Sequence, residues 1–395
     1  MTISNDKILK LAKKLYPAQI KWRRHFHQYP ELSNFEFKTT AFIKKELKKQ
    51  RIRIIPLRIP TGLAAIIGNK GKTTAAVRTD IDALPITEQN KIPFRSKIDG
   101  VMHACGHDMH IATVLGTAVI LNRLRKDLPG QVKIIFQPAE ENPPGGAIQM
   151  LKAGLFRKPK VDMIFGLHVD TTLPTGKISL RDGPTMASVI DFDIHIKGKS
   201  GHAARPHETV DAIAAVSELV GSIQKIVSRE IDPMKPVVIT FGKISGGTAR
   251  NVIADRAVLH GTARTLSPDN IRKLPALIKR TANGICRAHA AACKIDFIAD
   301  YPVLDNYPSA NKILAESYTE LFGKNKIEET GQVMGGEDFA YYLRQVPGAM
   351  FRLGARNRKI GAVNPWHYPN FMVDEESIFY GTSLLVKAVL KFFGK

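Results

Sequence analysis

The sequence predicts an α/β protein with two domains: a mixed, mostly parallel sheet flanked by helices, and a smaller α+β domain inserted into it. Three observations lead to this prediction. The chain has 395 residues, which is more than a single hydrophobic core usually serves. Its first half alternates buried-strand and helix patterns. Near residue 188 the apolar pattern changes to a period of two, which indicates a different kind of sheet.

Three apolar segments in the first half are typical of buried strands, at 74–78, 131–136 and 161–167. Between the first two, a helix is predicted over 108–126 because its apolar residues recur on one face. These residues are Ile111, Val114, Leu115, Ala118, Leu121 and Leu124. Buried strands joined by helices predict the mixed, mostly parallel sheet.

Residues 188–197 alternate apolar and polar side chains, as expected for a strand with one buried and one solvated face. A helix follows, and then strands near 236–244 and 254–264. A second helix opens at Ser267, a cap residue that precedes a first-turn proline, and a strand over 294–298 ends the unit. The order β-α-β-β-α-β predicts a ferredoxin-like split unit.

Helical patterns return after Asp305, with Ser309 as a predicted cap. A strand at 350–353 and an amphipathic helix over 375–392 follow. We therefore assign 185–303 to the inserted domain, and 1–184 together with 304–395 to a single outer domain.

The amino-acid composition limits the classes of protein to which the chain can belong. Apolar residues make up 44% and charged residues 24%, as in folded globular chains, and no apolar run approaches the roughly 18 residues that a membrane helix needs. The first 22 residues alternate charged and apolar residues and lack the apolar core of a secretory signal. Three cysteines are too few and too oddly numbered for a disulfide framework. These features predict a cytoplasmic protein without a membrane partner.

Lysine and arginine exceed acidic residues by 22, and the sequence pI is about 9.8, which raises the question of a nucleic-acid partner. The basic residues are scattered along the chain, and no basic stripe is interleaved with aromatic residues. The distribution favours a solvated basic surface and no nucleic-acid partner.

The segment HACGHD at 103–108 contains the strongest local signal for chemistry. Cys105 and His107 are two residues apart, beside a glycine and just before a predicted helix, so that both can point at one ion. Zinc accepts nitrogen and sulfur ligands, and a helix start favours the thiolate. A buried free cysteine beside a core histidine is the alternative.

Further candidates follow the next two buried strands. Glu140 and Glu141 are adjacent carboxylates that would repel each other unless a cation lies between them. One can bind metal while its neighbour holds a proton. His168 closes the following strand, at the sheet edge where open α/β sheets place ligands. A solvated loop is the alternative for the glutamates.

Asp80 and Asp82 share one face of an extended segment, where a carboxylate can orient a ligand histidine by accepting its second N–H. Ordinary turn chemistry before Pro85 is the alternative, and spacing alone leaves both open.

At this point the motifs match a known family. The chain resembles the aminoacylase and carboxypeptidase-like metallopeptidases, in the branch with hippurate hydrolase, indoleacetyl-amino-acid hydrolase and N-acetyldiaminopimelate deacetylase. The resemblance runs nearly end to end through RRHFHQYPELSNFEFKT (23–39), RTDIDALP (78–85), MHACGHDMH (102–110), QPAEE (137–141), FGLHV (165–169), SGHAARPH (200–207), GGTARNVIAD (246–255), GTART (261–265), MGGEDFA (334–340) and a late His367.

The resemblance implies a pair of divalent ions, with zinc, manganese, cobalt and nickel as candidates. Their implied ligands are Cys105, His107, Glu141, His168 and His367. It also implies Glu140 as general base, and an inserted domain that acts as a lid and as the surface of a homodimer. In such dimers, the lid of one chain often contributes residues to the active site of the other chain. We count Asp80 with the predicted catalytic residues, as a carboxylate that can orient a ligand histidine.

In the inserted domain, His202 resembles the family residue that donates a hydrogen bond to the developing oxyanion; a loop histidine is its alternative. Asn251 and Arg264 resemble substrate contacts, and an arginine can grip a carboxylate through two parallel hydrogen bonds. Gly335 and Gly336 would let the backbone approach the substrate, although glycine pairs usually serve turn conformation.

The sequence thus predicts a hydrolase that cleaves the amide bond of N-acyl amino acids with metal-activated water. Two departures concern the shape of the acyl pocket: QPAEE continues as NPPGG, and Ala254 stands where the family often has proline. Three alternatives stay open. They are a dipeptidase or carboxypeptidase with the same metals, a non-catalytic ligand-binding protein on the same fold, and a nucleic-acid binder suggested by charge alone.

Overall fold

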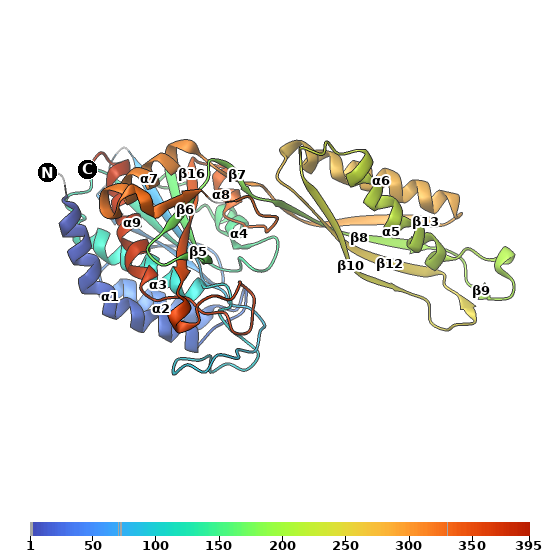
Figure 1. Cartoon of the computed structure of the whole chain (residues 1–395), viewed down its shortest axis with the longest axis horizontal. Helices are drawn as coiled ribbons and strands as arrows, with labels where there is room; N and C mark the ends of the chain where they lie inside the picture. The colour runs from blue at the N-terminus through green and yellow to red at the C-terminus, as the bar shows by residue number, and fades with distance from the viewer. Residues whose placement is uncertain (1–2, 70, 72, 330) are drawn as a thin grey trace. The chain divides into compact units, whose positions relative to one another are not determined.

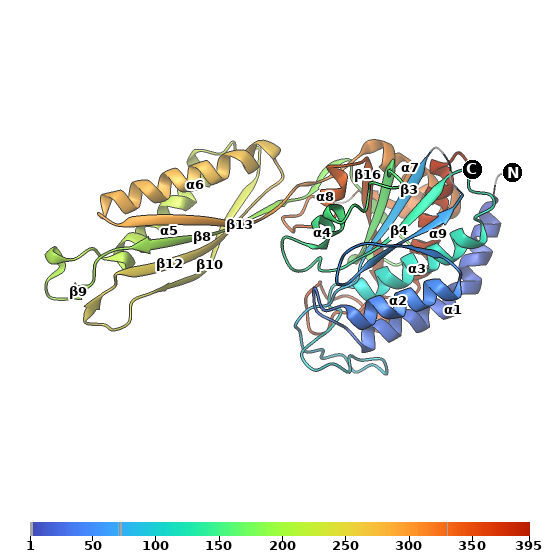
Figure 2. The same cartoon turned by 180° about the vertical axis from the view of Figure 1, so that it is seen from behind.

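The computed structural model describes residues 3–69, 71, 73–329 and 331–395, and it divides into two compact units (Figure 1; Figure 2 shows the reverse side). The first unit comprises Met1–Gly183, Asp305–Gly331 and Asp338–Lys395. The second comprises Pro184–Leu304 and Gln332–Glu337. The sequence analysis placed 332–337 in the outer domain. In the structure this segment clusters with the second unit because the Ala187 N–H donates to Val333 O and Gly335 O.

An eight-stranded sheet forms the centre of the first unit, in the order β1-β2-β4-β3-β5-β16-β6-β15. Its strands are β1 (Arg53–Ile55), β2 (Leu63–Gly68), β3 (Thr74–Asp80), β4 (Gln131–Gln137), β5 (Met163–Pro174), β6 (Ile178–Leu180), β15 (Ile327–Glu329) and β16 (Gly348–Arg356). The four middle strands, β4, β3, β5 and β16, run parallel, whereas β2 and β6 join them antiparallel. This confirms the predicted mixed sheet.

Helices cover this sheet (Figure 1). They are α1 (Asn5–Gln28), α2 (Phe37–Lys49), α3 (His107–Arg123), α4 (Gly146–Lys152), α7 (Pro308–Phe322), α8 (Ala340–Leu343) and α9 (Ser377–Phe392). The helices α1, α3 and α9 pack together over alternate strand residues such as Val77, Ile134 and Phe165. The intervening residues point to the opposite face. There α8 follows Phe339, whose ring lies against Gly166, and α4 contacts α8.

The second unit has the predicted order β8-α5-β10-β12-α6-β13, which confirms the ferredoxin-like arrangement. Its elements are β8 (Ser188–Lys197), α5 (Ala212–Arg229), β10 (Val237–Gly246), β12 (Arg256–Thr265), α6 (Pro268–Ala288) and β13 (Ala292–Tyr301). The strands are antiparallel in the order β10-β12-β8-β13. Ile190, Phe192, Ile194 and Ile196 point into a core beneath α5 and α6, which share one face of the sheet (Figure 1).

Short elements complete the chain. They are β7 (Gly183–Met186) paired with β14 (Leu304–Asn306), β9 (Gly201–His202) paired with β11 (Val252–Ile253), and the 3-10 turns η1 (Pro206–Glu208), η2 (Lys324–Lys326) and η3 (Arg358–Ile360). None of the helices in the described part of the chain has the length and hydropathy needed to cross a bilayer.

Two predicted boundaries were wrong. The cap of α7 is Tyr307 and not Ser309, because Pro308 already has a φ suited to the first helical turn. Strand β5 continues to Pro174, so His168 lies inside the strand and does not close it. The extension arises because β5 goes on pairing with β16 beyond the last residue that it shares with β3.

Candidate functional site

The candidate residues of the first unit gather where β3 and β4 end and where α3 begins. Asp80 is the last residue of β3, and Glu140 follows the end of β4 by three residues. Cys105 lies in the turn before α3, whose N-cap is Gly106 with φ 88°. An added Cβ at Gly106 would lie 2.4 Å from Val169 Cγ2, so this turn requires glycine for both its conformation and its packing.

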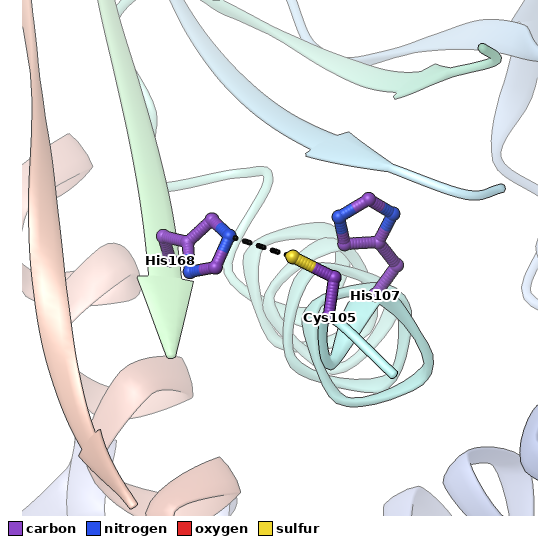
Figure 3. A group of neighbouring side chains, drawn as sticks. All are labelled: Cys105, His107 and His168. Carbon is purple, nitrogen blue, oxygen red and sulfur yellow. Dashed lines mark hydrogen bonds between the residues drawn. The ribbon is translucent and has the colours of Figure 1, made fainter. Parts of the chain in front are cut away.

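Cys105, His107 and His168 form a buried cluster (Figure 3). The Cys105 Sγ lies 3.4 Å from His168 Nε2, and each of the three residues has a ligand atom within 4.8 Å of the others. Figure 3 shows the sulfur and one imidazole arising at the start of α3, opposite the imidazole on β5. The turn and the strand therefore bring together one sulfur and two nitrogen ligands.

The backbone sets the tautomer of both histidines. The His107 Nδ1 lies 2.9 Å from Asp82 O, and the His168 Nδ1 lies 2.8 Å from Val169 O. A carbonyl oxygen only accepts, so each Nδ1 carries a proton, and in the neutral ring Nε2 has the lone pair that can bind a metal ion. Metal-ligating histidines usually donate their other N–H in this way. The His107 Nε2 is buried and has no hydrogen-bond partner in the described structure.

Glu141 and His367 extend the cluster. The Glu141 Oε1 lies 3.4 Å from His367 Nε2 and 3.8 Å from His107 Nε2. His367 has the left-handed φ of 66°, held by its N–H donating to Ala104 O at 2.9 Å. Cys105, Glu141 and His367 again have ligand atoms within 4.8 Å of one another. The structure thus brings together all five side chains that the family resemblance implies as ligands.

The electrostatics of the cluster suit a divalent cation. Burial opposes the charge of His107, but the carboxylates of Asp80, Asp82 and Glu141 outweigh it and raise its pKa to about 10. The carboxylates therefore create a negative potential that a proton or a metal ion on the imidazole balances. The set of sulfur, nitrogen and carboxylate donors is one that zinc and similar ions accept.

The helix start does not by itself favour the thiolate of Cys105, contrary to the expectation from the sequence. Burial raises the pKa of the thiol well above its ordinary value, and the charges of Glu141 and Glu140 add to this effect. A thiolate at this position therefore needs a cation beside it.

Glu140 is nine-tenths buried and has a carboxylate oxygen within 4.8 Å of ligand atoms of both His107 and Glu141. Beside it, the Glu141 N–H donates to Asp82 Oδ2 at 2.9 Å, which fixes the backbone of the carboxylate pair. The two adjacent glutamates therefore both reach the cluster.

Two aspartates at the end of β3 lie beside His107, and one of them also binds His110. Asp82 lies beside His107, with its Oδ1 3.3 Å from Nδ1. Asp80 lies 3.8 Å from the same nitrogen, and its Oδ1 accepts the Nδ1–H of His110 at 2.7 Å. The other His110 nitrogen accepts the Val169 N–H, so His110 has no lone pair free for an ion.

A buried group of polar residues around Arg78 was not predicted from the sequence. The Arg78 guanidinium donates to Gln137 Oε1, Asp80 Oδ2 and Asp338 Oδ1. Burial opposes the charge of Asp80, but His107, His110 and Arg78 outweigh it and hold the pKa of Asp80 well below its usual range. The one available signal was an arginine inside an apolar strand, since a fully buried charge needs partners.

In the second unit, His202 and Asn251 lie side by side. His202 pairs with Val252 between β9 and β11, and the Ala203 N–H donates to Asn251 O. The Ala204 N–H donates to His202 Nδ1 at 3.0 Å, so Nε2 carries the proton and is a hydrogen-bond donor. Both side chains are exposed.

Arg264 and Gly335 lie at the other end of β12. The Arg264 Nη1 donates to Met334 O at 3.0 Å, next to Gly335. A Cβ on Gly335 would make ordinary contact with Met186, whereas one on Gly336 would lie 2.5 Å from Val189. Packing therefore requires glycine at 336 and not at 335. The structure does not bring this pair to His202 and Asn251, because most of β12 separates them.

Comparisons with known proteins agree with this geometry. The model of peptidase family M20/M25/M40 matches residues 76–391. The N-acetylcysteine deacetylase of Bacillus subtilis is 39% identical over 93% of this chain and 94% of its own length. Thermostable carboxypeptidase 2 of Saccharolobus solfataricus is 37% identical over 99% of both. The crystal structure of a dinuclear metal-binding M20 peptidase from B. subtilis superposes with a TM-score of 0.85 and 34% identity, covering 97% and 99% of the two chains.

Proposed function

Because the chain belongs to peptidase family M20/M25/M40, we propose that it is a metal-dependent amidohydrolase that cleaves N-acyl amino acids to a carboxylic acid and a free amino acid. The observation that carries the proposal is the buried cluster of Cys105, His107 and His168, in which both histidines donate Nδ1–H to a backbone carbonyl and so leave Nε2 as the metal-binding nitrogen, while Glu140 reaches the same space. The relative named as a deacetylase supports the substrate class.

Cys105, His107, Glu141, His168 and His367 would hold two divalent ions, zinc, manganese, cobalt or nickel. Bound ions of this kind polarise a carbonyl and lower the pKa of water, which supplies the nucleophile. Asp82 keeps the His107 Nε2 available by accepting at Nδ1. Asp80 supports the cluster through its charge, 3.8 Å from His107 Nδ1, and through its hydrogen bond with His110.

Glu140 is the proposed general base. It accepts a proton from the attacking water and delivers it to the leaving amine, so that one carboxylate serves both halves of the reaction. Its position supports this role, because a Glu140 carboxylate oxygen lies within 4.8 Å of ligand atoms of both His107 and Glu141, where it can reach the attacking water.

We assign substrate contacts in the second unit to His202, Asn251, Arg264 and Gly335. The first pair and Arg264 lie near opposite ends of β12, which spans ten residues or roughly 30 Å. That separation exceeds the length of an N-acyl amino acid, so the two groups of one chain cannot contact the same substrate. A homodimer through the second unit, with each copy lending His202 and Asn251 to its partner, resolves this geometry.

A second candidate is a carboxypeptidase or dipeptidase with the same metals. The specific observation in its favour is the relative named as a thermostable carboxypeptidase, which aligns along 99% of this chain. Both candidates use the same cluster and differ in whether the substrate carries an acyl cap or a free amino group.

The test is an amine-release assay on hippurate, N-acetyl amino acids, N-acetyldiaminopimelate and a dipeptide panel. We expect the acylated compounds to be cleaved faster than the dipeptides. A clear preference for dipeptides would replace the first candidate by the second, and no release from any compound by metal-loaded protein would contradict both.

A further inference from the structure

Glu36 is a buried carboxylate in an exposed stretch of chain. It is 0% exposed, whereas its neighbours Phe35 and Phe37 are 65% and 55% exposed. This is the reverse of the usual pattern of burial. Burying a carboxylate costs free energy, whereas burying a phenylalanine side chain stabilises the fold. Burial raises the pKa of Glu36, which reflects the same cost. The Glu36 carboxylate must therefore have a hydrogen-bond partner in the interior.

The interior partner is the backbone of Ala139. The Ala139 N–H donates to Glu36 Oε1 at 2.7 Å, and the Ala139 carbonyl accepts from the Gly146 N–H at 3.0 Å. Ala139 has φ 50°, in the left-handed region that alanine rarely adopts. A residue stays in such a conformation only when its surroundings hold it there. Here the two hydrogen bonds provide that support, one on each side of the residue.

Ala139 directly precedes Glu140, and a second anchor fixes the far side of the glutamate pair. The Glu141 N–H donates to Asp82 Oδ2, which also accepts the Ser33 hydroxyl at 2.6 Å. Ser33 and Glu36 belong to the same short segment, so residues 33–36 contact the backbone on both sides of Glu140, directly at Ala139 and through Asp82 at Glu141.

We propose that Glu36 is a positioning residue for hydrolysis: its carboxylate holds Ala139 in the left-handed conformation and thereby aims the Glu140 carboxylate into the cluster. This rests on the proposed function, since the aim matters only if Glu140 transfers protons. Displacing a catalytic group by about 1 Å can lower a rate by two orders of magnitude. In the described part of the chain, Glu36 makes no hydrogen bond with Cys105 or with any of the ligand histidines.

The first arm of the test is structural and does not depend on activity. Glu36→Leu removes the acceptor at similar size, whereas Glu36→Gln keeps an amide oxygen in its place. We expect crystal structures to show Ala139 at negative φ and Glu140 displaced in E36L, and the native conformation in E36Q. A positive φ at Ala139 with Glu140 in place in E36L would overturn the proposal.

The second arm is kinetic. We expect kcat to fall at least about tenfold in E36L, with KM and metal content near those of the wild type, and to stay near the wild-type value in E36Q. Adding Ala139→Gly to E36L should restore part of kcat, because glycine adopts positive φ without strain. Glu46→Leu is the matched control, since Glu46 is a buried carboxylate of α2 that forms an ion pair with the exposed Lys49.

Equal losses of kcat in E36L and E46L would overturn the positioning role and leave only a structural one. If E36L does not fold, Ala139→Val provides the same test with Glu36 intact, since a β-branched residue disfavours positive φ; an unchanged kcat in A139V would contradict the proposal. A wild type that cleaves no acyl compound would contradict the proposed function. If Ala139 still loses its positive φ in E36L, the conclusion that Glu36 holds Ala139 in this conformation remains valid.

Discussion

The two units present their candidate residues in opposite ways. In the first, Cys105, His107 and His168 are buried, and backbone carbonyls fix the histidine tautomers. In the second, His202 and Asn251 are exposed, and Arg264 lies at the far end of the same strand. The first group lies within one unit and is held by buried hydrogen bonds. The second group is divided between the two ends of β12 and lies at the surface.

The difference separates two kinds of function. A metal site needs ligand atoms fixed to within fractions of an ångström, which a buried network of hydrogen bonds provides. Substrate contacts must admit and release a molecule, so exposed loops and strand ends are suitable places for them. We therefore expect variants of the first unit to abolish chemistry or stability, and variants of the second to change catalysis while metal binding stays intact.

The largest expected effect is that of Glu140→Gln. Removing the proton acceptor should lower kcat by about a thousandfold or more, because general base catalysis contributes up to four orders of magnitude. Metal content should stay at the wild-type value, since the adjacent Glu141 remains. Parallel kinetics and elemental analysis check this. Normal turnover in E140Q would show that the base is another group.

His202→Ala tests the second unit. We expect kcat to fall by two to three orders of magnitude, as when one donor to an oxyanion is removed, with unchanged metal content. His207→Ala is the control, because His207 is an exposed histidine of the same loop. If both variants are equally active, the second unit contributes no donor and the comparison of the two units breaks down.

His27→Gln tests the rigidity of the first unit. His27 lies between Asp108 Oδ2 (2.9 Å) and Glu88 Oε1 (3.1 Å); both oxygens accept, so both ring nitrogens donate and the ring is an imidazolium. Burial opposes this charge, but Asp108 and Glu88 outweigh it and raise the pKa of His27 above its usual value. Breaking such a buried pair costs about 3 kcal/mol of unfolding free energy.

The sign of the pH dependence follows from the raised pKa. The stability contributed by His27 is fully present below the unfolded pKa of histidine, and it is lost as pH rises through the folded pKa. Urea unfolding of wild type and H27Q should therefore differ most near pH 6 and less at alkaline pH. His25, whose pKa burial lowers, is the control: H25Q should show the opposite trend. A pH-independent difference for H27Q would contradict the imidazolium.

The smallest expected effect is that of Arg264→Lys, which keeps the charge and loses the planar fork. We expect KM to rise about tenfold, or 1.4 kcal/mol, for substrates with a free carboxylate. Substrates with an amidated carboxyl group should show a smaller difference between the two enzymes. An equal rise for both would mean that Arg264 serves the fold, through its bond to Met334 O, and not the substrate.

Candidate residues on strand ends and turns could be predicted from local patterns. Cys105, His107 and the pair Glu140 and Glu141 were singled out by their places after buried strands or before a helix, and the alternation over 188–197 predicted the whole of β8. The choice of Glu141 as the ligand of the pair came from the family resemblance. His367 came only from the family resemblance, because it lies in an irregular loop without periodicity. Pairings between distant residues were not accessible, since Arg78 on β3 and Asp338 in the turn before α8 meet only in the folded chain.

The same limit explains the other misses. His168 lies inside β5 because β16, from the end of the chain, extends the strand. The buried state of Glu36 depends on a backbone N–H about a hundred residues away, and its own neighbours, two phenylalanines, point to the opposite conclusion.

The most direct test of metal-dependent amide hydrolysis is the metal content of the purified protein together with amine release from N-acyl amino acids, before and after chelation and metal restoration. We predict about two divalent ions per chain, loss of activity on chelation and recovery on restoration. Cleavage of the amide that persists after all metal has been removed would contradict the account, as would a chain that binds no divalent ion.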